Sequence, residues 1–122
     1  MRLRGSHLLL TVVVLAGAGC GATASTIDVP GGDASRGAQL VDAYGCGACH
    51  TIAGIHGADA KIGPSLEDFA DQRYIAGRLP NNLSNLLRWL ENPQAVDPGT
   101  VMPNLGVVEP QARDLAAYLY SH

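Results

Sequence analysis

Apolar residues recur at helical spacing in several parts of the chain. The clearest stripe follows Asn82, where leucines at positions 83, 86, 87 and 90 keep the i, i+3, i+4, i+7 spacing of one helix face. Asp33 is placed to cap a helix over residues 34–44, and another helix begins near Glu109 and Pro110, where proline is tolerated. No stretch alternates or clusters β-branched residues as strands do. The pattern predicts an all-α fold.

The first and last of these helices have faces that suit close packing. Gly37 and Val41 share one side of the first helix. Because glycine leaves room for another backbone, we expect the two helices to cross. The inner face of the last helix consists of Ala112, Leu115, Ala116 and Leu119.

The middle of the chain is less regular. Residues 51–64 lack periodicity and predict a loop. Ser65 and Asp68 have the spacing of a capping box, which predicts one short helix through Ala70. Together, these segments predict about four short helices.

The N-terminal segment has the parts of an export signal. Arg2 and Arg4 precede an apolar run of 11 residues from Leu8 to Ala18, and small residues follow. Extending the run to Ala24 gives only 17 residues, the lower edge of what crosses a bilayer. We therefore interpret residues 1–20 as a signal peptide.

Two ends of this signal are compatible with the sequence. Ala22-Thr23-Ala24 is an A-x-A site for cleavage after Ala24. Gly19-Cys20 resembles the end of a lipoprotein signal, in which Cys20 is acylated. We prefer this interpretation because Cys20 would otherwise be an unpaired thiol in an exported protein. Both place the mature protein in the periplasm or on the outer face of the cytoplasmic membrane. Residues 21–32 then form a flexible tether, and residues 33–122 form one domain.

Composition points to a core that needs a large apolar group. Apolar residues make up 47 % of the chain, but aromatic residues only 5 %. A small domain this poor in large side chains gains stability from a bulky cofactor at its centre. The formal net charge is −3, and −5 without the two arginines of the signal. This acidic balance argues against nucleic acid as a partner, because phosphate binding needs a basic face.

The strongest motif is CxxCH, formed by Cys46, Cys49 and His50. A redox dithiol would need a βαβ context, which the pattern does not contain. A zinc site would need four ligands, and no second paired spacing of cysteine or histidine is present. A disulfide would leave the histidine without a role.

Covalent haem attachment uses all three residues. The two thiols add to the vinyl groups of the porphyrin, and the adjacent imidazole reaches the iron. Gly45 and Gly47 suit a backbone that must approach the ring edge closely. The motif therefore predicts one haem c, held by Cys46, Cys49 and His50.

Met102 is the candidate for the second axial ligand. It lies 52 residues after His50, in a loop with prolines and glycines on both sides. A thioether is a soft ligand that raises the reduction potential of haem iron. His56 and His122 are rival ligands, but the first is close to His50 in sequence and the second is terminal.

These residues resemble class I cytochromes c over nearly all of residues 33–121. The resemblance is carried by CxxCH, by IGPSL at Ile62 to Leu66 and by Met102-Pro103. The stretch LPNNLSNLLRWLENPQAVDPGTVMPNLGV is similar to the cytochrome c domain fused to subunit II of bacterial haem-copper oxidases. The resemblance implies the small cytochrome c fold, with helices around one covalent haem.

The resemblance also implies roles for individual residues. The carbonyl of Pro64 accepts a hydrogen bond from the proximal imidazole, and Trp89 donates to a haem propionate. Arg73 is a second propionate donor, with Gln72 as the neighbouring alternative. Tyr118 packs on the first helix.

Two positions depart from the family pattern. Val41 replaces an aromatic residue, and Val108 replaces a serine or threonine cap. Val41 predicts a smaller contact area between the first and last helices, and Val108 predicts a less well-capped last helix.

The function implied is that of an extracytoplasmic electron carrier rather than an enzyme. Because both axial sites of the iron are occupied in this interpretation, no substrate binds there and only an electron is transferred. The expected partners are respiratory-chain proteins such as a haem-copper oxidase or a quinol-oxidising complex. A membrane contact through the N-terminal anchor is expected, and no small-molecule substrate. Two alternatives stay open: a haem subunit of a larger dehydrogenase or oxidase complex, and a peroxidase or ligand sensor with a labile Met102.

Overall fold

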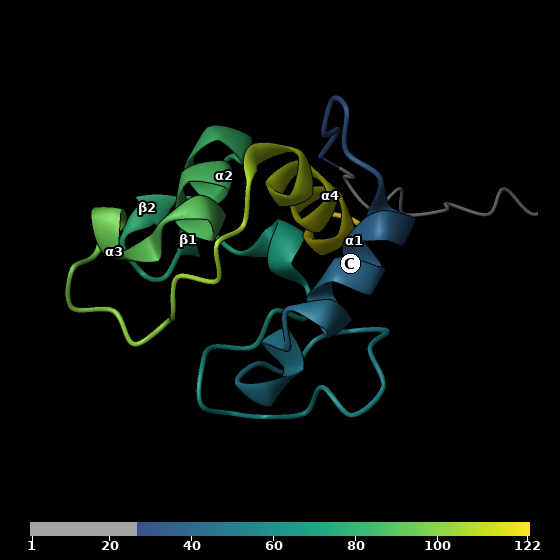
Figure 1. Ribbon diagram of the computed structural model, residues 1–122, viewed down its shortest axis with the longest axis horizontal. Helices are drawn as coiled ribbons and strands as arrows, with labels where there is room; N and C mark the ends of the chain where they lie inside the picture. The colour runs from purple at the N-terminus through teal and green to yellow at the C-terminus, as the bar shows by residue number, and fades with distance from the viewer. Residues whose placement is uncertain (1–26) are drawn as a thin grey trace, which may run out of the picture.

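The computed structural model describes residues 27–122 (Figure 1). The predictions of a signal peptide, of acylation at Cys20 and of cleavage after Ala24 fall outside the described residues. None of the helices within residues 27–122 is long and apolar enough to cross a membrane. The elements in chain order are α1 (Ala34–Ala43), η1 (Cys46–Ala48), η2 (Phe69–Asp71), β1 (Tyr74–Ile75), β2 (Leu79–Pro80), α2 (Leu83–Glu91), α3 (Pro93–Val96) and α4 (Glu109–Leu119).

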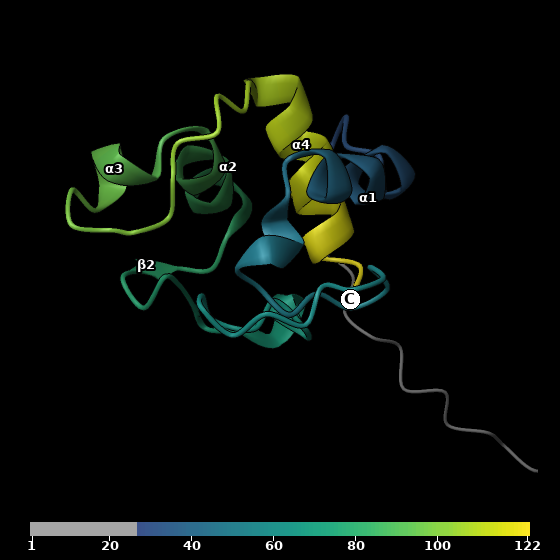
Figure 2. The same cartoon turned by 60° about the horizontal axis from the view of Figure 1, so that its bottom comes forward.

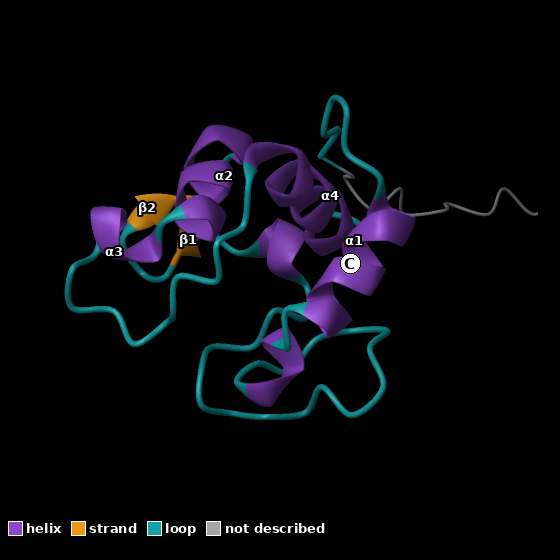
Figure 3. Ribbon diagram, in the orientation of Figure 1, coloured by secondary structure: helices purple, strands orange, loops and turns teal. Residues whose placement is uncertain are grey.

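The helices form two groups joined by loops. α1 and α4 lie together, whereas α2, α3 and the β1–β2 hairpin form the other group, and α2 packs on α4 (Figures 1 and 2). Long loops precede η2 and follow α3 (Figure 3). The prediction of an all-α fold of short helices is confirmed, apart from one small hairpin. Four of the candidate site residues lie in these two loops, namely Cys49, His50, Pro64 and Met102, whereas Cys46 lies on η1 and Trp89 on α2.

The crossing of α1 and α4 depends on Gly37. A Cβ at this position would collide with the backbone carbonyl of Asp114 and lie 2.7 Å from Tyr118 Cβ. Val41 is buried beside it, and the predicted inner face of α4 is buried throughout. Tyr118 thus packs on α1 as expected, and its hydroxyl donates a hydrogen bond to the carbonyl of Ala53.

An ion pair joins the same two helices. The guanidinium of Arg36 donates two hydrogen bonds to the carboxylate of Asp114, both of 2.8 Å, and the Asp33 N–H donates a third of 2.8 Å. Arg36 lowers the pKa of Asp114 below its ordinary value of 3.8, chiefly by hydrogen bonding, which outweighs the opposing effect of desolvation. Asp33 also caps α1 by accepting a hydrogen bond from the Arg36 N–H.

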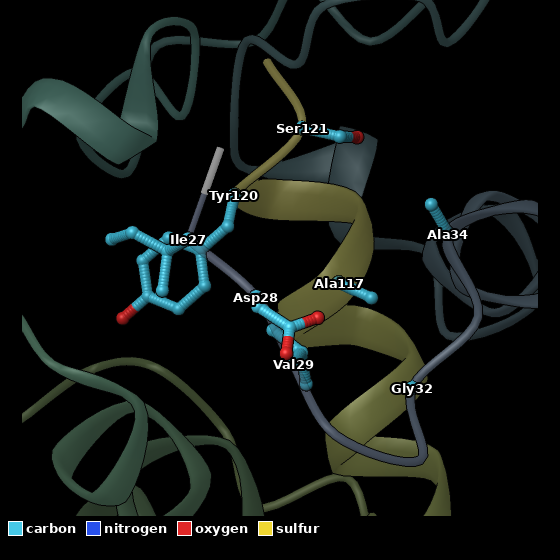
Figure 4. Close-up of a pocket in the computed structure, with 8 residues that line it drawn as sticks. All are labelled: Ile27, Asp28, Val29, Gly32, Ala34, Ala117, Tyr120 and Ser121. Carbon is cyan, nitrogen blue, oxygen red and sulfur yellow. The ribbon is translucent and has the colours of Figure 1, made fainter. Parts of the chain in front are cut away.

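The segment before α1 packs on α4, although the sequence assigns it to the tether. Val29 is buried, and the Arg113 guanidinium donates a hydrogen bond of 3.0 Å to the carbonyl of Pro30. A cavity of about 270 Å³ lies where this segment meets the end of α4 (Figure 4). None of the predicted haem-binding residues lines this cavity. Its lining is Ile27, Asp28, Val29, Gly32, Ala34, Ala117, Tyr120 and Ser121.

The predicted capping box before Ala70 is wrong. Ser65 Oγ accepts a hydrogen bond from the Glu67 N–H, only two residues on, so it forms a local turn. Asp68 has a left-handed backbone (φ 51°) and begins the short 3₁₀ turn η2 in place of an α-helix.

Two further elements were not predicted from the sequence. α3 is a single turn that begins with Pro93 and is capped by the Asn92 side chain, which accepts the Ala95 N–H at 3.2 Å. The β1–β2 hairpin has only two residues in each strand, and its turn contains positive φ angles at Ala76 and Gly77. Elements this short do not produce a recognisable hydrophobic period.

The first turn of α4 has a capping hydrogen bond that was not predicted from the sequence. The N-cap residue Val108 has no side-chain acceptor, as expected, but its N–H donates a hydrogen bond of 3.3 Å to Gln111 Oε1. The same oxygen accepts from the Tyr44 hydroxyl at 2.6 Å. Gln111 therefore satisfies the N-cap amide and connects the helix to the end of α1.

Replacing Gly37 with alanine tests the close helix crossing. The added methyl group forces α1 and α4 apart, and we expect the free energy of unfolding to fall by about 1–3 kcal/mol. Urea denaturation of the haem-loaded protein measures it. Ser35→Ala, on the exposed side of the same helix, is the control and should change stability by less than about 0.5 kcal/mol. Equal stability of the two variants would contradict the crossing.

The Asp114 ion pair predicts a specific dependence of stability on pH. Because its pKa is lower in the folded than in the unfolded chain, the pair stabilises the fold above pH 3.8 and this stabilisation is lost as the pH falls through the folded pKa. Asp114→Asn should therefore be less stable than wild type at neutral pH, with a difference that shrinks in acid.

Urea unfolding at a series of pH values measures this difference. Asp42→Asn, which changes an exposed carboxylate on α1, is the matched control. A difference between Asp114→Asn and wild type that stays constant down to acid pH would rule out the proposed linkage.

Candidate functional site

The CxxCH residues occupy one tight turn directly after α1. The N–H groups of Cys49 and His50 both donate to the carbonyl of Cys46, over 3.2 and 3.0 Å. Both cysteines are half-buried free thiols. The turn therefore places two unpaired thiols and an imidazole within one short segment of the chain.

Each of the two glycines in this turn has a local structural role. Gly45 has a left-handed backbone (φ 69°), which is the conformation that begins η1. A Cβ on Gly47 would lie 2.8 Å from Ala58 Cβ, so this glycine allows the loop over residues 51–64 to pack on the turn. Both glycines thus have local roles in the described structure, and their close approach to a ring edge stays a prediction.

The described elements around the cysteines do not form the βαβ unit of a redox dithiol. Burial raises the pKa of the Cys46 thiol, whereas a reactive cysteine needs a lowered one. Within residues 27–122, no group of three or more histidine, cysteine or acidic side chains is close enough to hold a metal ion by itself. The zinc alternative therefore has no ligand set in this part of the chain.

His50 is held in a single orientation. Its Nδ1 lies 2.6 Å from the carbonyl oxygen of Pro64, which can only accept, so Nδ1 carries a proton and, in the neutral ring, Nε2 has the free lone pair. The Gly63 N–H donates to the carbonyl of Cys49 over 2.7 Å. A Cβ on Gly63 would collide with the ring and lie 2.7 Å from Nδ1. Gly63 is thus a functional position that the sequence analysis quoted in its motif but did not interpret.

Met102 lies half-buried in the loop between α3 and α4, and both of its backbone groups are bonded. Its N–H donates to Thr100 Oγ1 over 3.2 Å, and its carbonyl accepts from Gln94 Nε2 over 2.7 Å. The loop is irregular but well hydrogen-bonded. The roles of Gln94 and Thr100 were missed from the sequence, because contacts between loop residues carry no periodic signal.

The two rival histidines lie elsewhere. His56 is exposed in the loop after the CxxCH turn, and no described residue forms a hydrogen bond with its ring. The His122 ring packs on Tyr118 with centroids 4.5 Å apart, and its Nδ1 lies 3.0 Å from the Tyr118 carbonyl. The terminal histidine is therefore engaged at the end of α4.

The predicted propionate donors have different surroundings. Trp89 is only 7 % exposed, and no described residue accepts a hydrogen bond from its indole N–H. Gln72 Nε2 already donates to the carbonyl of Ser65 over 2.9 Å. Arg73 is exposed and forms no ion pair with a described residue. Trp89 and Arg73 thus keep unused donors, whereas Gln72 does not.

A model of the cytochrome c family matches residues 34–122. The chain belongs to the cytochrome c family. The family's cofactor is covalently bound haem c, and the CxxCH spacing of Cys46, Cys49 and His50 agrees with it, which confirms the predicted cofactor. Haem-based electron transfer is the chemistry of this family.

Two relatives of this cytochrome c are both cytochrome c oxidase subunit 2. The chain is 42 % identical over 60 residues to that of Bacillus sp. (strain PS3), an alignment covering 48 % of this chain and 17 % of the relative. It is 39 % identical over 59 residues to that of Alkalihalophilus pseudofirmus (strain ATCC BAA-2126 / JCM 17055 / OF4), covering 48 % and 17 %. The alignments thus span about a sixth of these relatives' length, which confirms a partial similarity. No solved structure matches this chain.

The side chains of this cytochrome c fit a large apolar cofactor. α2 buries Leu86 and Trp89, yet its other leucines remain only half-buried. Apolar side chains of this kind gain free energy when a further group removes them from water. The half-buried leucines of α2 are Leu83, Leu87 and Leu90. Half-buried apolar residues also occur on η1, β2 and the loops; they include Cys46, Leu66, Leu79 and Met102.

Covalent attachment predicts a haem that survives denaturation. The wild-type protein, made in cells with haem ligation machinery, should exceed its polypeptide mass by one haem and stain for haem on a denaturing gel. The double variant Cys46→Ala/Cys49→Ala should lose the stain, whereas Cys20→Ala should keep it. Mass spectrometry and gel staining check both. A double variant that retains haem through denaturation would contradict the assignment of the thiols.

Proposed function

We propose that this protein is an extracytoplasmic monohaem electron carrier in which His50 and Met102 are the axial ligands of the iron. The observation that carries the proposal is the hydrogen bond between His50 Nδ1 and the Pro64 carbonyl. It leaves Nε2 as the unprotonated ring nitrogen, which is the form that binds a metal. It also increases the donor strength of the imidazole.

Each of the predicted haem-binding residues would have a separate role. Cys46 and Cys49 would attach the haem, and His50 and Met102 would supply the two protein ligands of the iron. When bound, the haem supplies a one-electron couple. The thioether raises the potential of that couple, because a soft sulfur ligand favours ferrous iron. Trp89 and Arg73, with their unused donors, hold the propionates.

The neighbours of Met102 favour electron transfer over chemistry at the iron. Val101 is 89 % exposed, and the following residues are Pro103 and Asn104. None of the three is an acid or a base that would help to cleave peroxide, and distal polarity decides between activation and transfer. A peroxidase or ligand sensor is therefore the weaker candidate.

The proposed partners are respiratory redox proteins outside the cytoplasm. The acidic net charge of −3 favours a basic docking patch on the partner, through a small and transient contact. A haem-copper oxidase or a quinol-oxidising complex fits this description. Acylation at Cys20 would keep the carrier at the outer face of the cytoplasmic membrane; cleavage after Ala24 would release it to the periplasm.

A second candidate is a haem subunit within a larger oxidase or dehydrogenase complex. Its support is the similarity to two cytochrome c oxidase subunits 2. Purification from membranes in mild detergent separates the two candidates. A carrier is recovered alone, whereas a subunit is recovered with its complex.

Replacing Met102 with alanine tests the axial ligation. We expect the ferric protein to lose the weak red absorption band of sulfur-ligated haem, and the reduced protein to bind carbon monoxide readily, because one axial site is open. The reduction potential should fall with the loss of the thioether. Optical spectroscopy and a redox titration measure these changes.

Three variants serve as controls for this test. Val101→Ala changes the exposed neighbour of Met102, and His56→Ala and His122→Ala remove the rival ligands. All three should keep the spectrum of the wild type. Loss of the red band in either histidine variant, together with its persistence in Met102→Ala, would exclude the methionine as ligand.

A further inference from the structure

Asp97 is a partly buried carboxylate with two separate partners. Its side chain is 17 % exposed, and it lies at the end of α3. One oxygen, Oδ1, accepts the Gly99 N–H over 3.1 Å within the Met102 loop. The other, Oδ2, lies 2.7 Å from Arg78 Nε, in a different element. The carboxylate therefore connects the loop to a second part of the molecule.

Arg78 belongs to the turn of the β1–β2 hairpin. Its N–H donates to the Ile75 carbonyl over 2.9 Å, which closes the turn. Ile75 is among the most completely buried side chains, so the hairpin is anchored in the core. The Asn81 N–H donates to the Arg73 carbonyl over 2.9 Å and fixes the base of the hairpin. The Arg78–Asp97 ion pair thus joins the loop to an anchored element.

A short series of hydrogen bonds leads from Asp97 to Met102. The Asp97 carbonyl accepts the Thr100 N–H over 3.0 Å, and Thr100 Oγ1 accepts the Met102 N–H over 3.2 Å. Gln94, on α3, holds the Met102 carbonyl from the other side. Movement of Asp97 away from the hairpin would therefore be transmitted to the backbone of Met102.

We propose that Arg78 and Asp97 are positioning residues that keep the Met102 thioether on the iron. This inference rests on the His50 and Met102 ligation proposed above. Methionine has three rotatable bonds and a neutral, weakly binding sulfur, so its retention depends on how firmly its backbone is held. The Arg78–Asp97 ion pair supplies a long-range attachment, because the other bonds of the loop are made by residues within eight positions of Met102.

The rate at which cyanide binds to the ferric protein measures this effect. Cyanide can bind only after the thioether leaves, so a looser loop binds it faster. Asp97→Asn removes the charge but keeps an oxygen for the Gly99 N–H, and Arg78→Gln removes the partner. Each should accelerate cyanide binding about two- to fivefold, which is the upper part of the range expected for an ion pair of this exposure.

The double variant and a matched control isolate the ion pair. Arg78→Gln/Asp97→Asn should bind cyanide no faster than the faster single variant, because the two changes remove one interaction. Arg88→Gln also removes one exposed arginine, but Arg88 forms no ion pair with a described residue. It should bind cyanide at the wild-type rate.

Hydrogen–deuterium exchange provides a readout that is independent of the iron. The Met102 and Gly99 amides should exchange faster in Asp97→Asn and Arg78→Gln than in Arg88→Gln, with helical amides unchanged. Circular dichroism confirms that each variant is folded. Arg78 is 61 % exposed, so Arg78→Gln should fold normally. If Asp97→Asn does not fold, Arg78→Gln alone provides the test.

The outcomes separate this inference from the proposed function. A wild-type ferric protein without the red sulfur band overturns the proposed ligation and, with it, the positioning role. A wild-type protein with the band, but with cyanide rates and Met102 exchange in the Asp97 and Arg78 variants equal to those of Arg88→Gln, overturns the positioning role alone. Faster cyanide binding with intact helices supports it.

Discussion

The site depends on a hydrogen bond between the imidazole of His50 and the backbone of Pro64, 14 residues later in the chain. It determines which ring nitrogen is free, and it sets the orientation of the ring. Gly63 leaves space beside the ring, and its N–H donates to the carbonyl of Cys49, which holds the loop next to His50. A loop without regular structure thereby fixes the orientation of the His50 ring.

The helices provide the frame on which this loop and the Met102 loop are held. Gly37 lets α1 and α4 approach closely, and the Arg36–Asp114 ion pair joins them at one end. This frame leaves part of the apolar surface of α2 half-covered. In a domain with few aromatic residues, a covalently attached haem would complete the core. Stability and electron transfer would then depend on the same group.

Residues with a periodic or local signal were predictable from the sequence. The cap at Asp33 and the leucine stripe after Asn82 correctly predicted α1 and α2, and the CxxCH spacing predicted the cofactor. The short elements were not predictable, because α3 and the hairpin contain too few residues for a period, and Asp68 adopts a left-handed backbone that its residue type does not require. The contacts of Gln94 and Arg78 were missed for another reason: they join loops, and their partners are decided only by the folded chain.

The most direct test of this account is iron X-ray absorption spectroscopy of the oxidised, haem-loaded protein. The account predicts six ligand atoms at the iron: four porphyrin nitrogens, one nitrogen from His50 and one sulfur from Met102. A first shell of nitrogen or oxygen alone would contradict the assignment of Met102. A purified protein that contains no iron, although it was made in cells competent for haem attachment, would contradict the account as a whole.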